Sequence, residues 1–230
     1  MNPDLLTRYF QNTVDIAQQT TLRFVLSPER QEEVVEARRL FSEDFMFRVL
    51  EIGHMSEIRL FSYFQSKEVH SDEDHLIIDQ TTGYNWRKGV DGVRTLLSEA
   101  GIIQIDSNVT GRHARENSLD IASAMIVAME DVEAVLQADF RFAAALYNEL
   151  DPYKRHQRFF WNASLSNLGY RTLTRNPHPG LSHTVNISGS QEPLLAFPNG
   201  RLITRDDLAR PTQESERAVF LWEKRHDSRL

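Results

Sequence analysis

SLDIASAMIVAMEDVEAVLQADFRFAAALYNEL, residues 118–150, carries the strongest helical pattern in this chain. Apolar residues recur along it at spacings of three and four positions, which places them on one stripe of an α-helix. The stripe consists of Leu119, Ala122, Met125, Met129, Val132 and Leu136. Because many further Ala and Ile residues flank it, the sequence predicts a long helix that is buried on more than one side.

Upstream of this helix the chain reads as a mixture of helices and short strands. Asn2 and Ser27 each precede a proline and then an acidic residue, which is the order of a helix cap, a first helical position and a first turn that favours negative charge. Short alternating or β-branched apolar runs indicate strands. The elements predicted here are helices at 2–19, 27–53 with a break near Ser42, and 86–100, and strands at 20–26, 57–66, 75–79 and 102–106.

Downstream, Asp151-Pro152 ends the central helix and caps another, which is predicted to continue to about Asn167. After Gly169 the chain becomes richer in short strands that are separated by Pro, Gly and Asn. These strands are predicted at 170–176, 181–189, 193–197 and 201–205. Pro198-Asn199-Gly200 is typical of a hairpin turn, and Thr212 caps a last helix.

Together these elements predict an α+β fold. A helical body with a few short strands would occupy about residues 1–168. A small antiparallel β-rich portion and a C-terminal helix would occupy residues 169–230. The second portion forms either a domain of its own or one domain with the first, since 230 residues suit one large or two small domains.

The composition narrows the class of protein. Of the 230 residues, 40% are hydrophobic and 26% are charged, which is typical of a globular chain with a packed core. The absence of cysteine excludes disulfides and thiolate metal sites. No apolar run reaches the roughly 18 residues that span a membrane, and the first residues lack a signal-peptide pattern. We therefore expect no membrane partner, and a location in the cytoplasm or in a particle assembled there.

One stretch differs from the rest of this acidic chain. Residues 153–176 contain five Lys or Arg, five aromatic residues and no acid, although the chain has a formal net charge of −7. Protein interfaces are enriched in aromatic residues and Arg and are poor in acids. The stretch therefore predicts a basic aromatic binding patch, formed by Lys154, Arg155, Arg158, Trp161, Tyr170, Arg171 and Arg175.

A protein partner suits this patch better than a polyanion does, because the negative charge of the remaining chain opposes the approach of nucleic acid. A basic face that docks on the acidic helices of a second copy makes a head-to-tail contact, which closes into a ring or propagates as a filament. The sequence thus favours a non-enzymatic structural or interaction protein, a subunit of an oligomeric or virion-type assembly, with no cofactor.

Nucleic-acid binding is the first alternative. The patch at 153–176 offers cations for phosphates and rings for stacking on bases. Independently, residues 85–112 are similar to the recognition helix and wing of a winged helix-turn-helix, because a helix with basic residues at its start is followed by a strand and a further basic residue.

A metal-dependent hydrolase is the second alternative. The segment HSDEDH at 70–75 holds two imidazoles and three carboxylates, which are ordinary donors for Zn, Mn or Fe. Its candidate ligands are His70, Asp72, Asp74 and His75. An exposed acidic turn explains the same residues without a metal. The chain has no Gly-x-Ser-x-Gly elbow and no phosphate-binding loop, so no other enzymatic motif is present.

Overall fold

We describe the protein from a computed structural model. The structure describes residues 9–10, 20–30, 34–58, 69–72, 75–79, 92–109, 126–168, 172–175 and 193–227. The helix predicted at 2–19 therefore lies outside the described residues except for Tyr9 and Phe10, and so does the strand predicted at 181–189. Of the strand predicted at 57–66, only the first two residues are described, and neither is in a strand.

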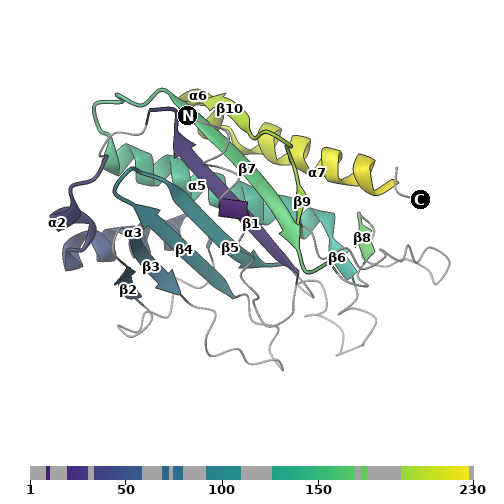
Figure 1. Ribbon diagram of the computed structural model, residues 1–230, viewed down its shortest axis with the longest axis horizontal. Helices are drawn as coiled ribbons and strands as arrows, with labels where there is room; N and C mark the ends of the chain where they lie inside the picture. Colours follow the sequence, from purple (N-terminus) through teal and green to yellow (C-terminus); the bar gives the residue numbers. More distant parts are fainter. Residues whose placement is uncertain are drawn as a thin grey trace.

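Most of the described strands join one antiparallel sheet (Figure 1). Its strands follow the order β10-β7-β1-β5-β4-β3-β2, and β9 also pairs with β7. Their bounds are β1 Thr21–Pro28, β2 Val69–Asp72, β3 His75–Asp79, β4 Val93–Ser98, β5 Ile103–Asn108, β7 Arg158–Ser166, β9 Leu194–Leu195 and β10 Arg201–Thr204. A separate parallel pair consists of β6, Ile126–Ala128, and β8, Thr172–Thr174.

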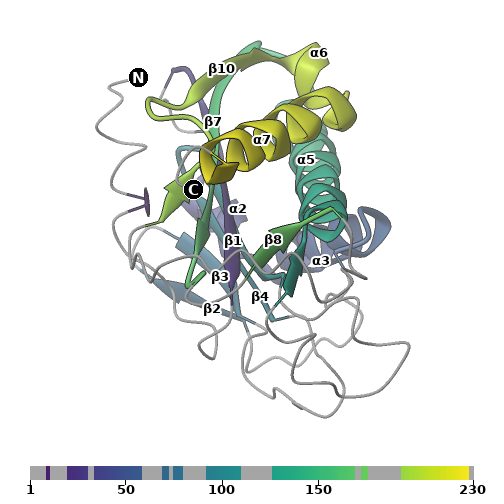
Figure 2. The same ribbon diagram turned by 90° about the vertical axis from the view of Figure 1, so that its right-hand side faces the viewer.

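Helices cover one face of this sheet, which we call the helix face; the opposite side is the outer face (Figure 2). The described helices are α2 Ala37–Leu40, α3 Glu43–Met55, α5 Met129–Leu150, α6 Arg205–Leu208 and α7 Pro211–Asp227. The long helix α5 packs on β1 and β5, and α3 and α7 pack against it. The fold is mixed α+β, as predicted.

The core lies between α5 and the sheet. Leu22, Phe24 and Leu26 alternate along β1 and are fully buried on the helix face. Phe140 of α5 meets Phe24 and Trp161 edge-to-face, with ring centroids 5.1 and 4.8 Å apart. These contacts explain why the predicted central helix is buried along most of its length.

The helix predicted from Asp151 to about Asn167 is wrong, because residues 158–166 form strand β7. Phe159, Trp161, Ala163 and Leu165 are all fully buried, and they alternate with a period of two. This is the pattern of a strand that lays one side on a core. Strand β7 sits between β1 and β10, in the half of the sheet nearest α7.

Three other predicted helices are shorter than expected. Ser27 and Pro28 end β1 rather than beginning a helix, although Ser42 caps α3 and accepts a hydrogen bond from the Phe45 amide at 3.3 Å. Residues 93–98, predicted as helix, form β4. The central helix begins at Met129, since Ile126–Ala128 pair with β8.

The predicted order, a helical body followed by a β-rich portion, is found only in part. A long central helix and a C-terminal helix are present, and α7 buries Ala218 and Trp222 as its predicted pattern requires. However, β1, β3, β4, β5 and β7 all lie before residue 168. Strands β9 and β10 from the later segment complete the same sheet by pairing with β7.

Pro198-Asn199-Gly200 does not join a hairpin. Strands β9 and β10, on either side of this turn, both pair with β7, so the turn bulges out of a single edge. Asn162 of β7 bridges the bulge: its Nδ2 donates to the Phe197 carbonyl at 2.8 Å, and its Oδ1 accepts from the Phe197 amide at 3.1 Å. The side chain thus replaces the backbone pairing that the bulge interrupts.

Replacing Asn162 with Ala is expected to lower the free energy of unfolding by about 1–3 kcal/mol, because a buried N–H and a buried carbonyl of Phe197 lose their partner. Urea unfolding measures this difference. The exposed Asn199, in the turn itself, is the matched control, and Asn199→Ala should change stability by less than about 0.5 kcal/mol. Equal effects of the two substitutions would contradict the bridging role.

Candidate interaction surface

The first part of the basic stretch forms the loop between α5 and β7, residues 151–157. Asp151 holds this loop from inside. Its carboxylate is fully buried and accepts hydrogen bonds from the backbone amides of Arg155, at 2.9 Å, and His156, at 2.8 Å. The loop therefore closes around a single side chain.

Arg205, at the start of α6, completes this closure. Its Nη1 donates to the Asp151 carboxylate at 3.0 Å, and its Nη2 donates to the carbonyls of Tyr147 and Asp151 at 2.9 and 3.1 Å. Burial alone would raise the pKa of Asp151. The two backbone amides and the Arg205 guanidinium outweigh that effect and hold the pKa below its ordinary value.

Tyr147 fixes the end of α5 on the other side. Its hydroxyl donates to the carbonyl of Gly101, in the turn between β4 and β5, and burial raises the pKa of the phenol well above its ordinary value. Gly101 has φ of +73°, and a Cβ added there would lie 2.7 Å from the Tyr147 hydroxyl oxygen. The helix end below the loop is therefore tied to the sheet.

This supported loop presents three residues to the solvent. Tyr153 is 87% exposed, which is the largest exposure among the large hydrophobic residues of the described chain. Lys154 follows it with φ of +54°, a left-handed conformation that is unfavourable for a side chain other than glycine. The Arg155 side chain is 63% exposed, and its Nε lies 3.6 Å from the Asp151 carboxylate. A rigid loop thus displays an aromatic ring beside two cations.

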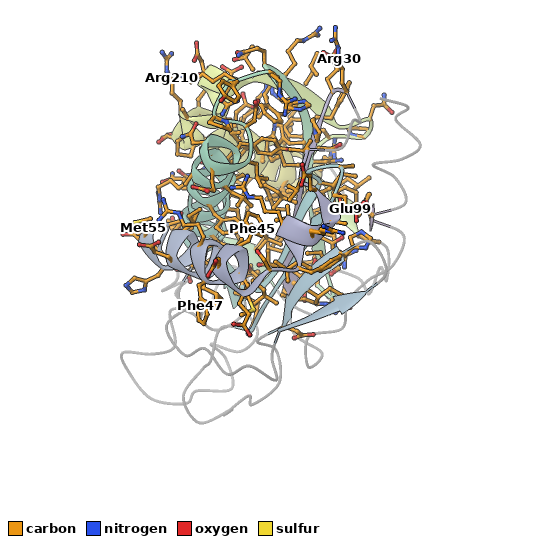
Figure 3. All side chains as sticks on the ribbon, turned by 90° about the vertical axis from the view of Figure 1, so that its left-hand side faces the viewer. Arg30, Phe45, Phe47, Met55, Glu99 and Arg210 are labelled. Carbon is orange, nitrogen blue, oxygen red and sulfur yellow. The ribbon has the colours of Figure 1, made fainter. Side chains whose placement is uncertain are left out.

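Further cations surround the loop. Arg158 pairs with Glu29 at 3.1 Å, and Arg30 directly follows that glutamate at the end of β1. Arg210, which is exposed, follows α6. Figure 3 shows Arg30 and Arg210 at the same end of the molecule. We call the surface formed by Arg30, Tyr153, Lys154, Arg155, Arg158 and Arg210 the basic end.

The structure does not bring the whole predicted patch together. Trp161 is fully buried, and its indole N–H donates to Glu214 at 3.2 Å, so its ring belongs to the core. Arg175 lies beyond the opposite end of β7 and pairs with Glu223 of α7 at 2.5 Å. Tyr170 and Arg171 lie outside the described residues. What remains of the prediction is its first third, the loop with Lys154, Arg155 and Arg158.

The residues of the two alternatives are placed differently from what the sequence suggested. The winged-helix-like segment contains strands β4 and β5 where its recognition helix was expected to end. For the metal site, Asp72 pairs with His75 across the β2–β3 hairpin, while Asp74 and the side chains of His70 and Asp72 lie outside the described residues. Within the described part of the chain, no three His, Asp or Glu side chains are grouped so that they could hold a metal ion.

A second polar cluster was not found by sequence reasoning. Four charged residues of alternating sign occupy one row across the outer face, each opposite the next on neighbouring strands. They are Arg23 of β1, Asp106 of β5, Arg94 of β4 and Asp79 of β3. Arg23 and Asp106 are buried and form a bidentate pair at 2.5 and 3.2 Å, and Gln104 donates to the same carboxylate at 2.8 Å.

The chain matches no protein-family model, and comparisons with curated proteins and with solved structures find no similar chain. Among the helices in the described ranges, none is both long and apolar enough to cross a membrane. The functional argument therefore rests on the geometry of the basic end alone.

Proposed function

We propose that this protein is a non-enzymatic interaction protein, a subunit that assembles by docking its basic end on an acidic surface of a second copy. The observation that carries the proposal is the loop at 151–157. It exposes Tyr153 between cations while Asp151 and Arg205 fix its backbone from inside. Such a loop loses little conformational entropy on binding, and Tyr and Arg are the residue types most often responsible for affinity.

The distribution of charge along α5 supports a head-to-tail contact. The loop follows the C-terminal end of this helix, whereas Glu130 and Asp131 lie in its first turn. A helix of 22 residues separates the two ends by about 33 Å. Near the acidic end, burial and the neighbouring Glu216 raise the pKa of Glu133. A cation brought there by a second copy would therefore be stabilised.

Light scattering at tens of micromolar protein tests the proposal. We expect a mass above the 26.6 kDa of one chain at low salt, and a lower mass at about 0.5 M salt, because salt screens exposed charges. The double variant Lys154→Glu, Arg155→Glu should weaken association about tenfold or more, since it sets like charges against each other. Tyr153→Ala should weaken it without changing the net charge.

The matched control is Arg38→Glu, Lys224→Glu, which changes the net charge equally at exposed positions outside the basic end. It should leave the mass unchanged. A wild-type protein that stays monomeric at both salt concentrations contradicts the proposal, and so does equal weakening by the control pair.

The two alternatives have separate readouts. Retardation of duplex or single-stranded nucleic acid at low salt, abolished by Arg155→Glu with Arg158→Glu, would assign the basic end to nucleic acid instead. A stoichiometric Zn, Mn or Fe signal in protein purified without chelator would favour the metal-dependent hydrolase.

A further inference from the structure

Tyr9 and Phe10 lie on the outer face, on the side of the sheet away from α5 (Figure 2). Phe10 is buried in a small apolar cluster with Val25 of β1 and Ile102, which stands just before β5. Tyr9, Ala100, Phe160 and Leu195 pack against this cluster. The cluster is separate from the main core on the helix face. We call the surface that receives the two aromatic residues the outer seat.

The buried row of charges takes part in the same seat. Arg23 uses its Nε and Nη2 for Asp106, and its Nη1 donates to the carbonyl of Tyr9. Since Asp106 and Gln104 fix the guanidinium, its remaining donor is aimed at one backbone position. The seat thus reads a chain segment in two ways, by a backbone carbonyl and by an adjacent phenylalanine ring.

Residues 9–10 and the seat are joined by a connection that is long compared with the contact. Phe10 and Thr20 are ten positions apart in sequence, a length of chain that spans up to about 35 Å when extended. The part of the seat that the structure describes depends on one carbonyl and one buried ring. The same contacts are available to any copy of this chain whose Tyr9–Phe10 comes within reach.

We propose that the outer seat also accepts Tyr9–Phe10 of a second copy, so that N-terminal segments are exchanged between subunits. The occupant is specified by the chain itself, because the seat already fits this sequence in one copy. Exchange of an identical element adds no new contact and has no need for a new complementary surface. This interface uses the outer face and is independent of the basic end, so it goes beyond the proposed function.

The absence of cysteine makes a direct test possible, since engineered thiols have no native competitors. Phe10→Cys and Ala100→Cys are placed in separate chains, which are mixed at tens of micromolar and oxidised. Exchange predicts a disulfide-linked dimer that contains one chain of each kind, because only then do the two thiols meet in the same seat. The band should increase with protein concentration. A matched mixture of Phe10→Cys with Phe220→Cys, at an exposed position on α7, should give at least tenfold less.

The two substitutions in one chain serve as the reference. That variant should close an internal disulfide and run as a monomer when dilute, which establishes that the pair is close in the seat. Internal closure without any mixed dimer would overturn the exchange, and failure to close at Ala100 and also at Leu195→Cys would overturn the seat itself. In the Lys154→Glu, Arg155→Glu background the mixed dimer should persist, so failure of the basic end and failure of the exchange give different results.

Discussion

Asp106→Ala is expected to lower the free energy of unfolding by about 3–5 kcal/mol, which is a large part of the stability of an ordinary domain. The substitution leaves the Arg23 guanidinium buried on the outer face without the carboxylate that it contacts twice. It also removes the acceptor of the Gln104 side chain, which lies at 2.8 Å. An isolated buried charge costs far more than the pair, because water no longer solvates it.

Urea unfolding of the two variants below measures this effect against an exposed pair. Glu57→Gln removes the acceptor of Arg141 at 2.8 Å, where both side chains are well exposed, and should cost less than about 1 kcal/mol. Arg23→Met with Asp106→Leu should recover most of the stability that Asp106→Ala loses, since it removes both charges and fills the space. A small effect of Asp106→Ala, similar to that of Glu57→Gln, would mean that solvent already reaches the pair.

The main layers of the fold follow from local sequence patterns. The helix over 129–150 was predicted from its apolar spacing, and strand β3 was predicted from the run HLIID at 75–79. Both patterns are set by residues within a few positions of one another, which is the range over which periodicity carries information. The mixed α+β class was predictable for the same reason.

The error at β7 has a specific physical cause. Asp151 was taken as the cap of a following helix, where a capping side chain accepts from an amide two or three positions ahead. It accepts instead from the amides of Arg155 and His156, four and five positions ahead. Its pairing with Arg205, 54 positions away, stabilises that turn. The local signal for a capping residue was correct, but a distant partner decided what it caps.

The candidate sites divide in the same way. The loop cations Lys154 and Arg155 adjoin each other in sequence and also in space, so clustering along the chain was a sufficient guide to them. Trp161 looked like part of the same patch, but strand alternation turned it into the core. The pair of Arg23 and Asp106, 83 positions apart, depends on the register of β1 with β5, which no local pattern contains.

Asp151→Ala is expected to cost about 3–5 kcal/mol at neutral pH, because Arg205 and two backbone amides lose a buried acceptor. It should also weaken self-association as strongly as Tyr153→Ala does, although Asp151 is fully buried and cannot touch a partner. The reason is that the loop loses the group that fixes its backbone. Light scattering on the folded variant, at a temperature below its unfolding transition, separates this effect from loss of structure.

The dependence on pH gives a further check of the same carboxylate. The folded-state pKa of Asp151 lies below its ordinary value of 3.8. Its contribution is therefore complete above about pH 5, and it is lost as the pH falls through 3.8 towards the folded-state pKa. The stability difference between wild type and Asp151→Asn should shrink over that range, whereas the difference for Asp206→Asn, at an exposed position on α6, should stay near zero. A difference for Asp151→Asn that is constant down to pH 3 would show that the carboxylate does not hold the loop as a charged acceptor.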